Sequence, residues 1–429
     1  MSGRRRAAAA LAALALTAGA CGSDAPTSAT TSTDRLEVVS WWTSGSEAAA
    51  LDTLFAGFRG TNPDVTTVNA AVRGGAGSQA IVALAKRLQQ GNPPDVWQTF
   101  AGKSVQGYAQ RGVVRDVGSV FASGDLASRM QPSILTSLMR GGKPYGVPTG
   151  AHRSNVLWFN TGVLAKAGVT PPSSGYTLPA FLDDLQKVKD SGAAAPLCLG
   201  GKDPFTTVEL AENALLSTIG TAGWRNMMDD RLDWGSSTVQ TALRSFGDML
   251  RYVDPQASGL TWDQATAKLA KGGCAYESMN DSAYGELLAA GAREGRDLGA
   301  TPFPGTDSSF LAVVDVFVAA TKAKNAKNAL AFLAGISDPA TQVAFSRAKG
   351  SVPVLRDVDV SALPPYQQAS SKSLWSQPVL PSLAHGEAMS PQFQEGFYDA
   401  VSTYVRTRDP DAFAADLRDA VTRDKIPQR

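Results

Sequence analysis

The sequence predicts an α/β fold built from two units, and two patterns support this prediction. Along residues 36–98, short apolar strands alternate with helices in the order strand, helix, strand, helix, strand. This alternation is typical of a parallel sheet covered by helices. A stretch of the same class begins near Tyr145. Roughly 395 residues follow an N-terminal leader and linker, which is enough chain for two domains.

The first unit can be followed element by element. Residues 36–40 read as a short apolar strand, residues 47–59 carry apolar side chains at helical spacing, and residues 65–72 alternate like a strand. A helix over 78–90 and a buried strand over 95–98 complete the unit. The second of these helices is expected to pack through Ile81, Val82, Leu84, Ala85 and Leu88.

The second unit mixes strands and helices and ends in a helical region. It opens with residues 145–148 and 152–160. Its expected strands are 195–199, 270–280 and 311–319, and its expected helices are 177–191, 208–220, 239–253, 326–336, 391–406 and 411–424. No repeat of solenoid period is visible, so the chain is not read as a repeat array.

Side chains at strand ends are the first candidates for a binding site. Doubly wound sheets bind ligands at the carboxyl ends of their strands, where loops lead into helices. Trp41, Trp42 and Gln98 fall at such ends. Neighbouring residues of a strand face opposite sides, so at most one of the two tryptophans is expected to touch a ligand while the other packs.

Composition excludes several function classes. Forty basic residues stand against thirty-nine acidic ones, which gives a formal net charge of +1. This balance argues against a nucleic-acid binder and against a polybasic membrane module. After the leader no apolar run reaches the length that a membrane-spanning helix needs.

The leader itself has the form of an export signal. Arg4–Arg6 precede an uncharged apolar stretch, and small residues then run directly into Cys21. This arrangement resembles a bacterial lipoprotein signal over residues 1–21, with Cys21 as the lipidated residue and the cell membrane as the anchor. Plain secretion is the alternative, because Ala18-Gly19-Ala20 also fits an A-x-A cleavage site. Residues 22–34 are small and polar and are expected to form a flexible linker.

Cysteine and histidine usage bears on bridges and metals. Cys198 and Cys274 both lie in strand-like runs, so a disulfide and two separately buried thiols are both compatible with the sequence. The chain has only two histidines, His152 and His385, and no C-x-x-C or H-E-x-x-H spacing. No metal site and no cofactor are therefore predicted.

Several segments, in their order and spacing, carry a family resemblance. They are SWW at 40–42, AVRGGAGSQA at 71–80, PPDVWQTFAG at 93–102, YGVPTGAHRSNVLWFN at 145–160, GLTWDQA at 259–265, SMNDSAYGE at 278–286, KGSVPVL at 349–355 and PSLAHGEA at 381–388. The chain is similar over essentially its whole mature length to extracellular solute-binding proteins of ABC transporters. Within them it resembles the sugar-binding subgroup, and above all the bacterial glucose/mannose-binding proteins.

The resemblance implies a two-lobe, type II periplasmic-binding-protein fold in which the ligand is enclosed by hinge bending. The chain would cross between the lobes near Gly150, Val313 and Asp357. The implied lobes are residues 35–149 with 313–357, and residues 150–312 with 358–429. A membrane permease would be the partner, a carbohydrate the ligand, and a monomer the expected state.

The resemblance also implies a set of ligand-binding residues, and their chemistry suits a sugar. An indole offers a flat apolar face, and carboxylates and amides can pair with the hydroxyls around the ring. Trp262 matches the stacking tryptophan, and His385 matches a ligand contact, whereas His152 is read as a structural histidine of the hinge. The implied ligand-binding residues are Trp41, Trp42, Glu47, Gln98, Trp262, Asn280, Asp281, Asp315, Lys349 and His385.

Two of these residues, Asp315 and Glu47, can also be interpreted without the resemblance. Asp315 interrupts an apolar stretch over 310–320, and a carboxylate there is costly unless something pairs with it. Glu47 matches a polar contact of the family, but a carboxylate in the first turn of a helix is also favoured by the helix dipole. Both interpretations of Glu47 stay open.

Two positions depart from the family's glucose binders. Phe100 stands where those proteins have a histidine, and Ser282 stands where they have a tryptophan. A roomier and less polar pocket is expected, so the sugar is expected to be larger or differently substituted than glucose. Export by the general or the twin-arginine route is not distinguished.

Two rival functions remain at this stage. An exported glycoside hydrolase could use any two carboxylates, although no G-x-S-x-G motif is present and a Ser-His-Asp triad would need one of only two histidines. A polyamine or peptide receptor of the same fold is the other rival. The leading prediction is a receptor with no catalytic residues.

Overall fold

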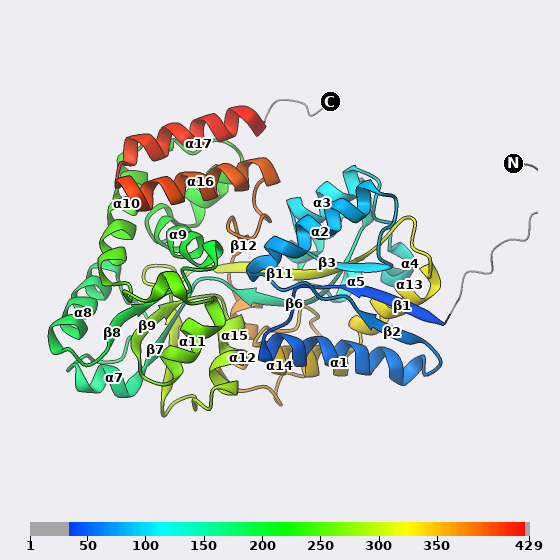
Figure 1. Ribbon diagram of the computed structural model, residues 1–429, viewed down its shortest axis with the longest axis horizontal. Coiled ribbons are helices and arrows are strands. Elements are labelled where there is room, and N and C mark those ends of the chain that lie inside the picture. Colours follow the sequence, from blue (N-terminus) through cyan, green and yellow to red (C-terminus); the bar gives the residue numbers. More distant parts are fainter. Residues whose placement is uncertain (1–33, 425–429) are drawn as a thin grey trace, which may run out of the picture.

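The computed structural model describes residues 34–424, which form two lobes lying side by side (Figure 1). The first lobe is built on a six-stranded sheet with the order β12-β11-β3-β1-β2, in which β6 also pairs with β11. Its strands are β1 (Arg35–Val39), β2 (Thr66–Asn69), β3 (Val96–Phe100), β6 (Val147–Arg153), β11 (Phe310–Ala319) and β12 (Val379–Pro381). A short pair, β4 (Met139–Arg140) and β5 (Lys143–Pro144), stands apart.

The second lobe has a four-stranded sheet with the order β10-β7-β9-β8. Its strands are β7 (Val156–Asn160), β8 (Ala195–Cys198), β9 (Cys274–Ser278) and β10 (Leu298–Pro302). The parallel pairs β1–β2 and β1–β3 confirm the parallel sheet predicted for the first unit. The two-lobe α/β fold is the predicted one.

Helices cover both sheets. Those of the first lobe are α1 (Gly45–Thr61), α2 (Ser78–Gln89), α3 (Lys103–Gln110), α4 (Gly118–Gly124), α5 (Leu126–Arg129), α6 (Pro132–Leu138), α13 (Ala326–Ile336) and α14 (Pro339–Lys349). The others are α7 (Thr161–Lys166), α8 (Leu178–Ser191), α9 (Pro204–Met228), α10 (Ser237–Met249), α11 (Trp262–Ala270), α12 (Ser282–Ala289), α15 (Pro365–Ser376), α16 (Pro391–Thr407) and α17 (Pro410–Asp424). Short 3-10 turns are η1 (Gly75–Gly77), η2 (Leu250–Tyr252) and η3 (Ala257–Gly259).

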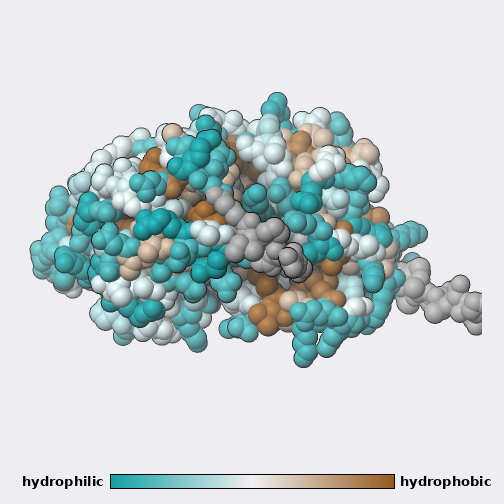
Figure 2. All heavy atoms as spheres, turned by 90° about the horizontal axis from the view of Figure 1, so that it is seen from above, coloured by the Kyte–Doolittle hydropathy of each residue, from teal (hydrophilic) through white to brown (hydrophobic). Residues whose placement is uncertain are grey.

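The packing face predicted for α2 is only partly right. Leu84 is buried and Leu88 packs against the core, as predicted, whereas Ile81 and Val82 are 45% and 67% exposed. The helix contacts its lobe through a stripe that runs through Ala80, Leu84 and Leu88, so Ile81 and Val82 lie outside it. Viewed from above, the surface is mainly hydrophilic and its hydrophobic patches are separated from one another (Figure 2).

Strand β11 is the element on which the site is built. It is buried along its whole length, and it pairs antiparallel with both β3 and β6. Asp315 lies opposite Phe100 on one side and Gly150 on the other, and the register with β6 shifts immediately after it. The sheet therefore places this single carboxylate next to the end of β3, at the boundary between the lobes.

The lobe boundaries themselves stay a prediction, but the connections can be described. Strand β6 of the first sheet leads within a few residues into β7 of the second. The backbone of Val352 bridges to Ala151 on β6, and β12 returns the chain to the first sheet beside β11. Residues 379–381 thus pair with the first sheet, although the predicted second lobe includes them.

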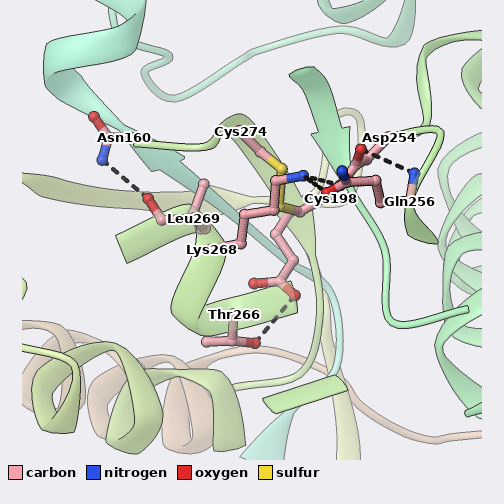
Figure 3. Close-up of a disulfide and its surroundings, with 9 residues drawn as sticks. Asn160, Cys198, Asp254, Gln256, Thr266, Lys268, Leu269 and Cys274 are labelled. Atoms are coloured by element: carbon pink, nitrogen blue, oxygen red, sulfur yellow. Dashed lines mark hydrogen bonds and ion pairs between the residues drawn. A yellow bond between two sulfur atoms is a disulfide. The ribbon is translucent and has the colours of Figure 1, made fainter. Parts of the chain in front are cut away.

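A disulfide joins Cys198 to Cys274 in the second lobe (Figure 3). Of the two alternatives that the sequence left open, a disulfide or two separate thiols, the first is confirmed. Cys198 ends β8 and Cys274 begins β9, and these strands are parallel neighbours. The two Cα atoms lie 5.6 Å apart, within the usual range for a bridge. The bond closes a loop of 76 residues, so it should restrict the unfolded chain strongly.

The predicted export signal, with Cys21, lies outside the described residues. Across residues 34–424, the structure contains no helix of the length and apolar character that crossing a bilayer requires.

Candidate functional site

A pocket lies between the two lobes, and both lobes contribute to its walls. The lining residues come from the loop after β1, the first turn of α1, the η1 turn, the end of β3, the neighbouring strands β6 and β11, the end of α14, and the second lobe. They are Trp41, Trp42, Glu47, Gly74, Gly75, Ala76, Phe100, His152, Phe205, Trp262, Met279, Asn280, Ser282, Val313, Asp315, Lys349 and His385.

The structure brings together the binding residues that the sequence predicts. All of them line the pocket except Gln98 and Asp281, which lie directly behind it and hydrogen-bond to lining residues. The Gln98 amide donates to the Asp315 carboxylate at 2.8 Å, and Gln98 accepts from Ser40 Oγ at 2.7 Å. Gln98 is therefore a positioning residue in this arrangement.

An ionic network occupies the hinge side of the pocket. His152 Nδ1 lies 2.5 Å from Asp281 Oδ1, and its Nε2 lies 3.4 Å from Asp315 Oδ2. Asp281 also accepts the backbone N–H of Arg153 at 3.1 Å and the hydroxyl of Tyr366 at 3.3 Å. The imidazole thus joins a carboxylate of the second lobe to the carboxylate of β11.

Ion pairing in this network favours the charged forms of His152 and Asp315. Burial and the Lys349 charge act to lower the pKa of His152, but the Asp281 and Asp315 carboxylates outweigh them and raise it. Burial acts to raise the pKa of Asp315, but hydrogen bonding from His152 and the charge of Lys349 lower it overall. The two shifts are in the directions that strengthen the ion pair between His152 and Asp315.

Lys349 connects the two walls of the pocket. Its ammonium group lies 3.1 Å from Glu47 Oε1 at the start of α1 and donates to Ser282 Oγ at 2.7 Å on α12. Burial raises the pKa of Glu47, although Lys349 opposes this shift. A second contact joins α1 to α12, where Ser46 donates to Glu286 Oε1 through its backbone N–H at 2.9 Å.

Aromatic rings form the apolar part of the walls. Trp41 packs against Phe100, with ring centroids 5.1 Å apart, and Phe100 in turn meets the edge of His385 at 5.1 Å. Trp42 is buried against Phe345 at 5.2 Å, so it fits the packing role that one tryptophan of the pair was expected to have. Its ring still borders the pocket.

Trp262 is fixed from the second lobe. It is the first residue of α11, where a capping box between Thr261 and Gln264 closes the helix start. Its backbone N–H donates to Asp203 Oδ2 at 2.9 Å. The indole is therefore held by the start of a short, capped helix and presents its ring to the pocket, as a stacking platform requires.

The η1 turn brings the two lobes into close contact. A Cβ on Gly75 would lie 2.8 Å from both Asp203 Oδ1 and the Phe205 ring, so a larger residue could not approach this closely. The glycine run at 74–77 was a visible signal of this approach, although its role was not predicted. Phe205 was missed because nothing local distinguishes a phenylalanine in the first turn of α9 from a core residue.

The two positions that differ from the glucose binders, Phe100 and Ser282, make different contributions to the wall of the pocket. Phe100 fills its position with a ring that packs on Trp41 and His385. Ser282 keeps a polar group in the wall, because its hydroxyl accepts from Lys349. The expectation of a less polar pocket therefore finds support at Phe100 but not at Ser282.

A second buried cluster, also missed, lies beside the pocket. Glu209 and Glu212 on α9 and His385 place their ligating atoms within 4.8 Å of one another. Asn280 Nδ2 donates to Glu209 at 2.6 Å, and Glu212 accepts from the hydroxyls of Ser154 and Ser382. These donors already use the carboxylates, so the group needs no metal ion to be satisfied. The prediction of no metal site is unchanged.

Burial favours the neutral forms of the groups in this cluster, unlike those of the network at the hinge. Burial raises the pKa of Glu212 to about 7 and that of Glu209 well above its ordinary range. Burial also lowers the pKa of His385 to about 3. His385 is packed edge-on against Phe100 and Phe205, which keeps water from its ring.

The pocket therefore offers flat indoles together with charged and neutral hydrogen-bonding groups around them. Pockets between lobes with few, well-placed polar groups are typical sites for small ligands. A buried polar group left unpaired by a wrong ligand costs roughly 1–3 kcal/mol, so this rim can discriminate between ligands of similar size.

Comparisons with known proteins identify the family of this chain. A probable sugar-binding periplasmic protein of Mesorhizobium japonicum is 32% identical over 378 residues, which cover 86% of this chain and 88% of that protein. A xylose/arabinose-binding protein of Haloferax volcanii is 27% identical over 365 residues, covering 83% of this chain and 78% of that protein.

Among solved structures, a chitin oligosaccharide binding protein is similar in fold, with a TM-score of 0.79 at 19% identity, over 91% of this chain and 98% of that one. The family model for bacterial extracellular solute-binding proteins matches residues 42–343. This family consists of receptors that act outside the cytoplasm and not of enzymes. The chain therefore belongs to the bacterial extracellular solute-binding proteins and has their two-lobe, type II fold.

Proposed function

We propose that this receptor captures a mono- or small oligosaccharide by hinge closure and delivers it to the membrane permease of an ABC importer. The observation that carries the proposal is the composition of the pocket. Trp262 and Trp41 supply apolar ring faces, while Glu47, Asp315 and Asn280 surround them with hydrogen-bonding groups. That combination matches a sugar ring, which has apolar C–H faces and an equator of hydroxyls.

Contacts between the lobes support capture by closure. Lys349 joins Glu47 to Ser282, and Ser46 bonds to Glu286 across the same boundary. These contacts stabilise a closed arrangement, and a ligand that touches both walls would add to them. Opening would separate these polar contacts, the ion pair between His152 and Asp281 and the packing of the η1 turn on Phe205, while each lobe keeps a hydrophobic core of its own.

A thermal-shift screen against mono- and disaccharides tests this function. A true ligand raises the melting temperature by mass action as its concentration passes the dissociation constant. The variant Trp262→Ala should lose most of the shift, whereas Trp375→Ala, outside the pocket, should keep it. If spermidine or a peptide produced a shift and no sugar did, the sugar proposal would be wrong. Turnover of an aryl glycoside would point to a hydrolase instead.

We further propose that Cys21 is lipidated, that the lipid holds the receptor at the cell membrane, and that the receptor acts as a monomer. A tethered receptor keeps captured ligand near its permease, and two acyl chains suffice for stable anchoring. The full-length protein expressed in a bacterium should fractionate with membranes and carry the mass of a lipid on Cys21. The Cys21→Ser variant should not. Recovery of the wild-type protein as an unmodified soluble form would contradict the anchor.

A further inference from the structure

A second pocket lies on the other side of the hinge strand β6. It has a volume of about 390 Å³, within the range of pockets that hold small organic ligands. His152 and Arg153 are successive residues of β6, so their side chains point to opposite faces. His152 lines the pocket between the lobes, and Arg153 lines this second one.

Arg153 is the distinctive group of this second pocket. It is only 6% exposed, and its guanidinium donates to Ser309 O at 3.0 Å and to Asn155 Oδ1 at 3.2 Å. Within residues 34–424 no carboxylate forms an ion pair with it at 4.0 Å or less. Burial lowers the pKa of Arg153 although more distant acidic groups oppose this shift. A buried guanidinium without a directly paired carboxylate is costly, and an anionic ligand would compensate its charge.

The other residues that line this pocket restrict the kind of ligand that it can bind. Hydroxyl groups surround the space, and they come from the loop before α8, from β10 and from α15. The hydroxyl-bearing lining residues are Ser173, Ser174, Thr301, Tyr366, Ser370 and Ser373. Asp307 adds one carboxylate to the wall, which accepts the backbone N–H of Gly175 at 2.6 Å. Its negative charge disfavours a polyanion.

We propose that this second pocket binds a small hydroxylated monocarboxylate, whose carboxylate pairs with Arg153 and whose hydroxyls pair with the serine-rich walls. The pocket has a direct connection to the site between the lobes. Asp281 accepts from the backbone of Arg153 and from the Tyr366 hydroxyl on one side, and it binds His152 on the other. A ligand that draws the Tyr366 hydroxyl away from Asp281 changes the environment of His152.

Thermal denaturation of the tag-free mature protein tests the site, with sodium gluconate and sodium lactate as probes and sodium chloride at equal ionic strength as the reference. At least one carboxylate should raise the melting temperature by several degrees when it is well above its dissociation constant. Ala369→Trp, which fills the pocket from an exposed position of α15, should abolish the shift. Ser376→Trp, an exposed position of the same helix outside the lining, should leave it intact.

The same experiment separates this site from the one between the lobes. Gluconate binding at the second pocket should survive Trp262→Ala. The proposal is overturned if neither carboxylate stabilises the wild-type protein beyond chloride, or if the shift survives Ala369→Trp. Loss of the gluconate shift in Trp262→Ala but not in Ala369→Trp would place the carboxylate between the lobes instead.

The connection between the pockets rests on the proposed sugar binding and has a separate test. Titration calorimetry with the best sugar from the screen should give a dissociation constant that changes at least threefold in saturating gluconate, and by the same factor in reverse. Tyr366→Phe removes only the hydroxyl that reaches Asp281, so it should bring this factor close to one. An unchanged factor in Tyr366→Phe would overturn the connection while leaving the second pocket in place.

Discussion

The molecule contains two buried clusters of histidine and carboxyl groups beside the same pocket, and the pKa of the histidine shifts in opposite directions in the two. At the hinge, His152 sits between Asp281 and Asp315, and its pKa is raised. In the second lobe, His385 lies 3.7 Å from Glu209, and its pKa is lowered to about 3. A buried histidine near carboxyl groups can therefore have either a raised or a lowered pKa.

Contact geometry explains the difference. His152 lies 2.5 Å from one carboxylate and within ion-pair distance of a second, so its charge is compensated at close range. His385 lies farther from its nearest carboxyl and between two phenylalanine rings, where burial favours its neutral form. Burial dominates where carboxyls are distant, and close ion pairing dominates where they are near.

The largest effect is expected for Asp315→Asn. This change leaves the His152 charge with one carboxylate partner and places an amide opposite the Gln98 amide. Removing one partner of a buried pair should cost roughly 3–5 kcal/mol of unfolding free energy, measured by urea denaturation at pH 7. Asp357→Asn breaks an exposed pair with Arg129 and should cost less than about 1 kcal/mol. Equal losses in the two variants would contradict an ionic network at the hinge.

Asp315 is also an example of a site residue that the sequence could predict. Asp315 was identified because a carboxylate inside an apolar strand is costly without a partner, and the structure supplies that partner. His152 was read only as structural, because its contact with Asp281 joins residues 129 positions apart. Local periodicity did predict the parallel sheet and most of the long helices, because those patterns depend only on residues that are close in sequence.

The cluster of Glu209, Glu212 and His385 could not be predicted from local sequence patterns. Glu209 and Glu212 lie on α9, where acidic side chains normally mark the solvent face of a helix, yet both are fully buried. They are buried because α9 is covered by α16 and by the loop that carries His385. Burial of a helix on several sides depends on chain segments far away in sequence, which local periodicity does not show.

The two histidines should respond to pH in opposite directions. The folded pKa of His385 is about 3, below its ordinary value, so its contribution to stability is present at neutral pH and is lost as pH falls from about 6.5. The folded pKa of His152 is raised, so its contribution is present below about pH 6.5 and is lost as pH rises through the folded pKa.

Replacing each histidine should remove its own pH dependence. Between pH 6.5 and pH 4, His385→Gln should lose about 3 kcal/mol less unfolding free energy than the wild-type protein does. His152→Gln should instead flatten the loss above pH 6.5. Urea denaturation across pH 4 to 9 measures both effects. Parallel pH profiles for the two variants would show that the clusters do not differ in charge.

A smaller effect is expected where Lys349 bridges the walls. Ser282→Ala removes the hydroxyl that accepts from Lys349 at 2.7 Å, while the contact with Glu47 remains. The expected loss is about 1 kcal/mol in stability or, for a sugar that needs the closed arrangement, a several-fold weaker affinity by calorimetry. Ser376→Ala, at an exposed site, is the control. No change in either quantity would mean that the bridge does not contribute to closure.

The smallest effect is expected for Glu209→Gln, and it is the sharpest test of the neutral cluster. Burial raises the pKa of Glu209 well above its ordinary range, which favours the protonated carboxyl, and a glutamine amide reproduces the size and charge of that form. The variant should differ from the wild-type protein by less than about 1 kcal/mol at pH 7, because its carbonyl can still accept from Asn280 Nδ2 at the 2.6 Å contact, and only the longer 3.2 Å contact with the Asn280 backbone N–H is lost. A loss as large as that expected for Asp315→Asn would mean that Glu209 carries a charge, and the contrast between the two clusters would then fail.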